Sequence, residues 1–454
     1  MGDVVSTRLL TGWGRTSVTA ARVVAPSDDA AVGAVLAHPP ERGVLARGLG
    51  RAYGDAAQNA GGIVLDLTAA AAPPALDGGT GLVTAAGGTS FDELLRFLLP
   101  HGFFVPVTPG TRHVTIGGAV AADIHGKNHH RDGSWMDHVT AIELVLAGGE
   151  ARTVGPDQDA AAFWATAGGM GLTGVVMACT FRALPVETSH MVVDTTRLGD
   201  LDAVMAAMAD TDARHRYSVA WLDATAGRRA LGRGIVTGAD HAPRDAIDGE
   251  GSLTFDPRSR AGVPAVLPGG LLNAHAIRAV NEAWFRLAPR RRRGAVQTIA
   301  SFFHPLDAVA GWNRLYGRRG FVQWQCVVPD DAADVLRVVL ERLHRAGSAS
   351  FLTVLKRFGP GNPGPLSFPQ AGWTLALDLP AATGGLAGTL DGLDRLVADS
   401  GGRIYLAKDV RLAPELVAAM YPRLDEWRAV RHRLDPAAAL QSDLGRRLGL
   451  VGVS

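Results

Sequence analysis

The sequence predicts an α+β fold divided into two or three domains. The chain has 454 residues, and a globular domain usually holds about 150 residues. Up to about residue 190, short strand-like runs alternate with glycine-rich turns. The segments 200–210, 331–346 and 414–450 have the apolar spacing of helices instead. With 47% hydrophobic and 20% charged residues, the composition is that of an ordered globular protein.

The strand-like runs of the first part are bounded by turn residues. Residues 44–46 lead into a loop at 47–62, and residues 63–67 are typical of the next strand. The runs 139–146 and 151–154 flank a Gly-Gly turn, which predicts a hairpin. These elements describe a sheet-rich first part.

The expected helices have recognisable ends. Ser90 and Glu93 form a capping box, and the apolar residues behind them follow one helix face until Pro100 stops it. The segment 331–346 ends at Gly347 in the C′ position. The tail, residues 414–450, reads as helices broken at two prolines, and residues 240–295, rich in Pro, Gly and Arg, are expected to be irregular.

Charge and apolar runs exclude several classes of protein. A net charge of +1 argues against a nucleic-acid partner. There is no apolar run long enough to span a bilayer and no hydrophobic signal region near the start. We therefore expect a soluble protein, cytoplasmic or peripheral at the inner membrane, with the periplasmic face left open. Cys179 and Cys326 make no metal-binding or redox motif and are expected to be buried.

Three stretches of small residues give the first indication of a ligand. Residues 46–55 look like a dinucleotide fingerprint, but Tyr53 occupies its last glycine position, and a loop and strand follow instead of a helix. Closely spaced glycines can still form a nest of backbone N–H groups for a pyrophosphate. Residues 106–111 with 115–119 form a second such stretch and residues 165–174 a third, where backbone can approach a flat ligand. Together they fit a large dinucleotide that lies across the loops of a sheet.

These motifs resemble the flavoenzymes of the vanillyl-alcohol-oxidase type. Within that type, the chain is similar nearly end to end to the oxidases of prenyl-phosphate ribose. The similarity runs from residues 10–16 to residues 442–443. Its most specific segments are 46–55, 123–130 and 163–166, and further on 358–360 with 365–369, and 420–423. The resemblance implies an FAD-binding domain made of residues 1–187 and 403–454. It also implies an α+β substrate domain, residues 188–402, built on an antiparallel sheet.

The resemblance also implies an activity. It is the FAD-dependent oxidation of the 2′-hydroxyl of decaprenylphosphoryl-β-D-ribose to a 2′-keto sugar, by hydride transfer to flavin N5. This is the first half of an epimerisation that makes the arabinose donor for arabinan in actinobacterial cell walls, and a short-chain NADH-dependent reductase subunit would complete it. Two alternatives stay open: an alditol or aldonolactone oxidase of the same fold, and a non-catalytic flavin-binding subunit.

The implied cofactor site draws on four parts of the chain. By the resemblance, FAD is lined by Ala46, Arg47, Gly48, Leu49, Gly50, Arg51, Ala52, Tyr53, Gly54, Asp55, Ala56, Gly110, Thr115, Ile116, Gly117, Gly118, Ala122, Asp123, Ile124, His125, Val176 and Tyr405. Many relatives bind flavin covalently through a histidine in the first glycine loop. No histidine occurs in residues 46–55 here, so we expect non-covalent FAD.

Lysine is rare in this chain and marks the expected active site. Of 45 basic residues only Lys127, Lys356 and Lys408 are lysines, and a lysine in a desolvated pocket can serve as a base, which arginine cannot. By the resemblance, Lys408 contacts the reacting hydroxyl, and the catalytic group is Lys408, Lys127, His125 and Tyr53. The implied substrate-binding residues are Lys127, Gln323, Gln325, Lys356, Thr374 and Ala376. Lys356 is alternatively a ligand of the substrate phosphate.

Two other features have simple interpretations. His125, His129 and His130 suggest a metal, but the spacing needs a helix and Gly126 disfavours one, so we predict no metal.

The arginine run 290–293 follows an apolar patch. It is either a solvated loop or a contact with anionic lipid headgroups, which leaves peripheral membrane contact open.

The chain departs from the family pattern in the substrate domain. Relatives commonly have Asn and Cys where this chain has Thr374 and Ala376. Catalysis here therefore cannot depend on that thiol.

Overall fold

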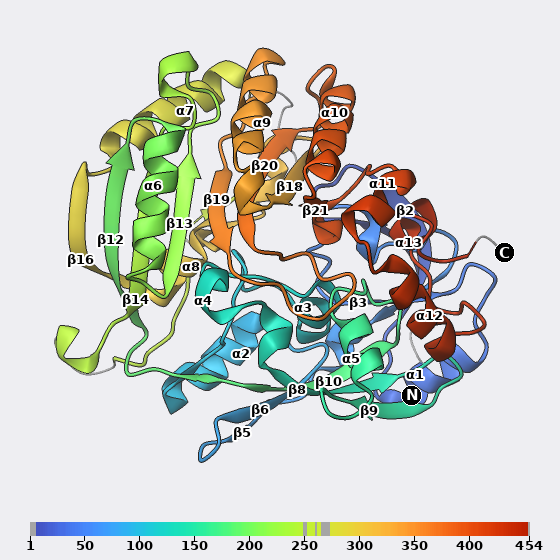
Figure 1. Ribbon diagram of the computed structural model, residues 1–454. Coiled ribbons are helices and arrows are strands. Elements are labelled where there is room, and N and C mark those ends of the chain that lie inside the picture. Colours follow the sequence, from blue (N-terminus) through green and yellow to red (C-terminus); the bar gives the residue numbers. More distant parts are fainter. Residues whose placement is uncertain (1–5, 248–251, 259–260, 265–272, 453–454) are drawn as a thin grey trace.

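An eight-stranded antiparallel sheet forms one half of the molecule (Figure 1). The computed structural model describes residues 6–247, 252–258, 261–264 and 273–452. In spatial order the strands are β16 (Arg291–Thr298), β12 (His190–Leu198), β14 (Gly234–His241), β13 (Tyr217–Leu222), β19 (Thr353–Phe358), β20 (Gly372–Pro380), β18 (Phe321–Val328) and β21 (Arg403–Ile404).

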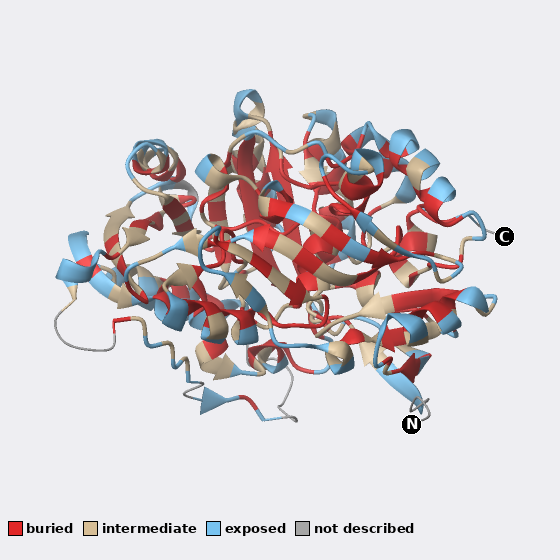
Figure 2. Ribbon diagram, turned by 90° about the horizontal axis from the view of Figure 1, so that it is seen from below, coloured by how far each residue is buried: buried red, intermediate tan, exposed pale blue. Residues whose placement is uncertain are grey.

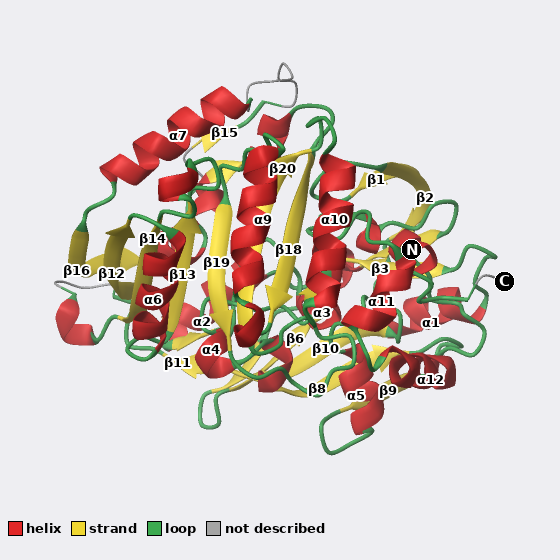
Figure 3. Cartoon of the chain, turned by 45° about the horizontal axis from the view of Figure 1, so that its top comes forward, coloured by secondary structure: helices red, strands yellow, loops and turns green. Residues whose placement is uncertain are grey.

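Three helices cover one face of this sheet. They are α6 (Leu201–Asp212), α9 (Asp334–Arg345) and α10 (Leu386–Asp399), which lie side by side in Figure 3. Trp324 of β18 faces this layer, because its Nε1 donates a hydrogen bond to Asp394 of α10 at 2.8 Å. Successive residues of a strand point to opposite faces. Gln323 and Gln325 therefore point to the other face, toward the rest of the molecule.

The other half contains two smaller sheets. The first has the order β1-β2-β4-β3, and the second β5-β6-β10-β8-β9. Their strands are β1 (Ser6–Thr11), β2 (Val18–Val24), β3 (Val44–Arg47), β4 (Ile63–Asp66), β5 (Ala75–Asp77), β6 (Leu82–Ala86), β8 (Val139–Val145), β9 (Ala151–Val154) and β10 (Val175–Arg182). Two short pairs, β7 (Phe103–Phe104) with β11 (Leu184–Pro185) and β15 (Ala261–Gly262) with β17 (Val309–Ala310), complete the strands.

The remaining helices pack around these sheets. They are α1 (Asp29–Ala37), α2 (Phe91–Leu98), α3 (Ile116–Ala122), α4 (His129–Asp132), α5 (Ala160–Thr166), α7 (Ala274–Leu287), α8 (Ile299–Phe303), α11 (Pro414–Met420), α12 (Leu424–Leu434) and α13 (Asp443–Arg447). The C-terminal helices, red in Figure 1, return to lie beside the blue N-terminal strands. Buried residues gather where the two halves meet, and exposed residues lie on the outer faces (Figure 2).

Most of the expected elements are present. The capping box of Ser90 and Glu93 starts α2, the hairpin β8–β9 is antiparallel, and Gly347 follows α9 with φ +66°. A short 3₁₀ turn at Asp55–Ala57 and then β4 follow the first glycine loop, so the Rossmann interpretation was rightly set aside. These elements follow from local capping, turn and apolar patterns.

The expectation of an irregular stretch at 240–295 was wrong in part. Residues 248–251, 259–260 and 265–272 of it lie outside the described residues. The rest contains α7, which begins where Asn273 accepts hydrogen bonds from the backbone of His275 and Ala276. Residues 291–293, expected in a loop, begin the edge strand β16. Tertiary pairing with β12 outweighs a composition that is unfavourable for a strand.

The strand distribution supports the division that we propose for the chain. Seven of the eight strands of the large sheet lie within the proposed substrate domain, residues 188–402, and the eighth, the two-residue β21, begins directly after it at Arg403. Residues 1–187 and 403–454 form the proposed FAD-binding domain. Within the described residues, the helices are all too short or too polar to cross a bilayer.

Candidate active site

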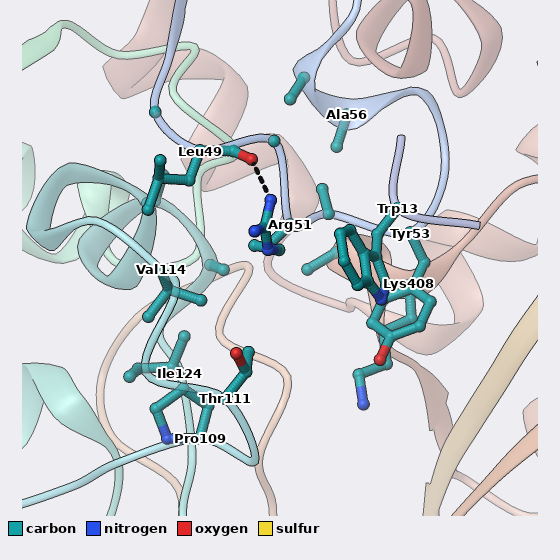
Figure 4. A pocket seen from close by; sticks show the side chains of 18 of the residues that line it. Trp13, Leu49, Arg51, Tyr53, Ala56, Pro109, Thr111, Val114, Ile124 and Lys408 are labelled. Atoms are coloured by element: carbon teal, nitrogen blue, oxygen red, sulfur yellow. Dashed lines mark hydrogen bonds between the residues drawn. The ribbon is translucent and has the colours of Figure 1, made fainter. Parts of the chain in front are cut away.

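A cavity of about 330 Å³ lies between the free face of the eight-stranded sheet and the glycine-rich loops of the other half. Its walls come from the first glycine loop, from α3 and the segment before it, from β18, β19 and β20, and from residues 405–408. Figure 4 shows Arg51 pointing into it, with Trp13, Tyr53 and Lys408 together on one side. Segments far apart in the sequence thus meet at one hollow.

The first glycine loop is built to receive an anion. The backbone N–H groups of Leu49, Gly50 and Arg51 make no hydrogen bond to any described residue. The Arg51 guanidinium lies 4.2 Å from the centroid of the Trp13 ring and donates to the Leu49 carbonyl at 2.6 Å. Free N–H groups beside a fixed cation form a nest for phosphate oxygens. A Cβ at Gly110 would meet nothing within 4 Å, so the wall there is open to a flat ligand.

The end of this loop is fixed by the C-terminal part of the chain. A Cβ at Gly54 would lie 2.0 Å from the carbonyl oxygen of Asp409, so only glycine fits. Arg447 of α13 pairs with Asp55 at 2.7 Å and with Asp409 at 2.8 Å. Gly54 and Asp55 therefore hold the loop against the segment that carries Lys408, and neither lines the cavity.

The free face of the sheet carries polar side chains in register. Gln323 of β18 is opposite Asp378 of β20, and Gln325 is opposite Ala376. On the other side of β20, Lys356 of β19 is opposite Thr374. Thr374 does not line the cavity, and its hydroxyl accepts a hydrogen bond from Gln325 at 2.9 Å. The sheet thus presents amide, ammonium and methyl groups to the ligand.

Lys408 and Lys356 line the same cavity and have lowered pKa values. Burial lowers the pKa of Lys408 to about 8, and the nearby Asp378 carboxylate opposes that effect. Burial and the charges of Lys408 and Lys127 lower the pKa of Lys356 well below its usual value. A lysine whose pKa lies near the working pH can exchange a proton with a reacting group.

His125 contacts two polar side chains of the eight-stranded sheet. Lys356 Nζ donates to His125 Nδ1 at 3.0 Å, and the Gln325 side-chain nitrogen lies 3.0 Å from His125 Nε2. Burial, with Lys356 and Lys408 nearby, lowers the pKa of His125 well below its usual value, so the ring is neutral. The ring packs between Phe358 and Tyr405 at centroid distances of 4.8 and 5.5 Å. His125 therefore orients Lys356.

Lys127 lies behind the cavity wall. Its Nζ donates to the Phe302 carbonyl and lies 4.1 Å from the centroid of the Phe302 ring. Burial lowers the pKa of Lys127 to about 7. Lys127 does not line the cavity, and its charge reaches the site by acting on Lys356.

Asp123 holds the segment that follows β19 in place. It has φ +38° at the end of α3, and its buried carboxylate accepts hydrogen bonds from Asn362 at 2.7 Å and Ser367 at 2.5 Å. The same carboxylate accepts from the Met136 backbone at 3.1 Å. Burial raises its pKa to about 6. Asp123 thus ties the His125 loop to the substrate domain without lining the cavity.

Most of the residues expected around FAD and substrate meet at this cavity. Those that line it are Ala46, Arg47, Gly48, Leu49, Gly50, Arg51, Ala52, Tyr53, Ala56, Gly110, Thr115, Gly117, Gly118, Ala122, Ile124, His125, Val176, Tyr405, Gln323, Gln325, Lys356, Ala376 and Lys408. Those that do not line it are Gly54, Asp55, Ile116, Asp123, Lys127 and Thr374.

Several cavity residues were missed from the sequence. Pro109, Thr111, Met170, Gly171 and Gly174 belong to the second and third small-residue stretches, which gave a usable signal. Trp13 lies in the matched segment 10–16. Other cavity residues without a local signal are Val114, Leu306, Trp312, Leu352 and Val354.

The histidine cluster does not form a metal site in the part of the chain that the structure describes. His129 lies against Phe358 with ring centroids 4.4 Å apart, and burial lowers its pKa to about 3. His130 Nε2 contacts the His215 carbonyl at 3.1 Å. These side chains pack α4 against the sheet.

Comparisons with known proteins agree with this geometry. Residues 20–155 match the family profile of an FAD binding domain. A decaprenylphosphoryl-β-D-ribose oxidase from Mycolicibacterium smegmatis is 43% identical over 98% of this chain and 98% of its own length. An uncharacterized protein from Streptomyces coelicolor is 44% identical over 79% of this chain and 99% of its own. An alditol oxidase from a Streptomyces species is 28% identical over 44% of this chain and 48% of its own.

Fold, cavity and family profile define a flavoenzyme of the vanillyl-alcohol-oxidase type, whose cofactor is FAD. The match to the mycobacterial oxidase extends over both halves of the chain. The chain belongs to the decaprenylphosphoryl-β-D-ribose oxidase family.

We expect FAD to be bound without a covalent link. The first glycine loop offers Arg51, Ala52 and Tyr53 where a histidine would be needed. Precipitation of the holoenzyme with acid should leave the flavin in the supernatant, measured by its absorbance. Flavin that stays with the washed pellet, or a flavin-sized mass increment on a peptide, would contradict this.

We also expect this protein to escape inhibitors that capture the family cysteine covalently. Ala376 lines the cavity at that position and has no nucleophile. Intact-protein mass spectrometry should show no adduct on the wild type after incubation with such a compound, and an adduct on Ala376→Cys. An adduct of equal yield on both proteins would place the reaction elsewhere.

Proposed function

We propose that the protein oxidises the 2′-hydroxyl of decaprenylphosphoryl-β-D-ribose to the 2′-keto sugar. The observation that carries the proposal is the position of Lys408 and Lys356 on the wall of a cavity that the glycine loops line on its other side. Bound FAD supplies the hydride acceptor. The protein must then accept the hydroxyl proton and stabilise the charges that develop.

The side chains of the cavity have distinct roles in this reaction. Lys408 accepts the proton of the reacting hydroxyl, and Tyr53 lies beside it, with Lys408 Nζ 5.4 Å from the Tyr53 ring centroid. Lys356, held by His125, donates hydrogen bonds to the sugar or its phosphate. Gln323 and Gln325 donate and accept hydrogen bonds from the sheet. The apolar parts of the lining exclude water from the reacting carbon.

Anaerobic mixing tests the proposal. Mixing with decaprenylphosphoryl-β-D-ribose should bleach the absorbance of the oxidised flavin, and free ribose should bleach it at least tenfold more slowly. No bleaching by the prenyl-phosphate sugar would overturn the proposal and would favour a non-catalytic flavin-binding subunit.

The similarity to an alditol oxidase covers less than half of the chain. A soluble sugar oxidase is therefore the weaker candidate, and xylitol and an aldonolactone should be included as substrates in the same experiment.

To complete an epimerisation, a partner must reduce the keto sugar with the opposite stereochemistry. We propose a short-chain NADH-dependent reductase subunit for that step, which together with the oxidase yields the arabinose donor for cell-wall arabinan.

We further propose that the protein meets its lipid substrate at a membrane surface. Val280, Trp284 and Leu287 of α7 lie at i, i+4 and i+7 and are 55%, 60% and 83% exposed. The exposed arginines 291–293 follow at the start of β16. An apolar stripe beside cations suits anionic headgroups.

Vesicle sedimentation tests this contact. Replacing the three arginines 291–293 with glutamine should lower binding to vesicles that contain phosphatidylglycerol by about tenfold or more, since each cation near such a surface contributes about 1 kcal/mol. Leu9→Ser is the matched control, because Leu9 is an exposed apolar residue on β1. Unchanged binding of the arginine variant would remove this surface from the proposal.

A further inference from the structure

A buried carboxylate, that of Asp378, lies behind the wall of the cavity. Asp378 is fully buried on β20, two residues after Ala376, so its side chain points to the same face of the sheet. Its Oδ1 accepts a hydrogen bond from Gln323 Nε2 across the β18–β20 pair. Its Oδ2 has no hydrogen-bond partner among the described residues. A buried carboxylate in that state is costly unless a charge compensates it.

The groups that face Asp378 come from three other segments. They are Lys408 in the 3₁₀ turn Leu406–Lys408, Tyr53 in the first glycine loop, and Tyr316 at the end of the turn Trp312–Tyr316. Of these only Lys408 can carry a positive charge. Burial raises the pKa of Asp378 to about 7, and Lys408 opposes that effect, as Asp378 does for Lys408. The two groups are therefore coupled through their charges.

We propose that Asp378 is a positioning residue that stabilises the ammonium form of Lys408, which arises when Lys408 accepts the hydroxyl proton of the substrate. The inference rests on the function proposed above. In the step, the hydrogen on the carbon that bears the hydroxyl leaves together with the electron pair of its C–H bond, as the hydride that bound FAD would accept. The O–H bond breaks, its proton forms a new bond to Lys408 Nζ, and the carbonyl forms. The carboxylate compensates the new positive charge without touching the substrate.

The chain permits a direct measurement of this effect, because it contains three lysines. Protein labelled with ¹³C at lysine Cε should give three side-chain signals, and Lys408→Arg identifies the one from Lys408. We expect the midpoint at which that signal titrates to be lower in Asp378→Asn than in the wild type by about one pH unit, because the variant removes an opposite charge that interacts with Lys408.

A second carboxylate provides the matched control. Asp394 is also buried, but it lies in the helix layer on the opposite face of the sheet, bonded to Trp324 and Arg411. Asp394→Asn should leave the Lys408 midpoint unchanged. If Asp378→Asn does not fold, Asp378→Thr suits the strand, keeps a hydrogen-bond acceptor for Gln323 and removes the charge. An unchanged midpoint in the folded variant would overturn the proposal.

The pH profile of flavin reduction gives an independent readout. The neutral amine of Lys408 is the active form, so the rate rises with pH through the pKa of Lys408, and loss of Asp378 should move this limb to lower pH and lower its plateau. If substrate reduces the wild-type flavin normally and the pH limb of Asp378→Asn stays in place, only the role of Asp378 would be refuted. Absence of reduction in the wild type would refute the proposed function, while the lysine titration would still decide the pairing.

Discussion

Lys408→Ala should lower the rate of flavin reduction by about 10²- to 10⁴-fold, the range expected for loss of a general base. Lys408 is half-buried on the cavity wall next to Tyr53, and no other lysine approaches that ring as closely among the described residues. The wild-type rate should rise as the pH increases through about 8, where Lys408 loses its proton. In the variant this limb should disappear.

Rapid mixing under anaerobic conditions measures this loss, and FAD content must be measured alongside it. Lys408→Arg separates charge from proton transfer, since arginine keeps the cation but cannot accept the proton. Arg395→Ala, on the exposed face of α10, controls for loss of one positive charge elsewhere. A Lys408→Ala enzyme with full FAD and near wild-type reduction would remove Lys408 from the mechanism.

Gly54→Ala should destabilise the protein by about 1–3 kcal/mol or more, the usual cost of forcing an extra methyl group into a packed interior. The new Cβ would lie 2.0 Å from the Asp409 carbonyl oxygen, which is backbone and cannot rotate away. The loop must then separate from the segment that carries Lys408, so we expect loss of both FAD and activity.

Thermal unfolding of the holo and apo forms and the flavin-to-protein ratio test this expectation. Gly78→Ala is the control, because a Cβ there meets nothing within 4 Å and Gly78 lies in an exposed turn. A Gly54→Ala protein with wild-type melting temperature and full FAD would show that the two segments can move apart freely.

The sequence predicted the elements that carry local signals. The α2 capping box, the β8–β9 hairpin and the glycine stop after α9 depend on residues near one another in the chain, so they could be read directly. It missed α7, because a helix of moderate propensity lies between stretches rich in proline, glycine and arginine, and it missed β16, which exists through pairing with β12.

The candidate site divides in the same way. The glycine loops and all three lysines were predicted at the site, since small residues and rare ammonium groups are visible without a structure. The structure places Lys356 and Lys408 on the cavity wall, but not Lys127. The role of Asp378 was not predicted, because β18 and β20 are buried on both faces and show no alternation that would fix which residues face the ligand. The position of Lys127 behind the wall likewise depends on packing against Phe302.

The ion pairs of Arg447 have a consequence for biosynthesis. Asp55 and Asp409 are held together by the side chain of Arg447, which is synthesised after both of them. A nascent chain that has completed the eight-stranded sheet still lacks these ion pairs. Until residue 447 has been synthesised, its side chain cannot hold the first glycine loop against the segment around Asp409.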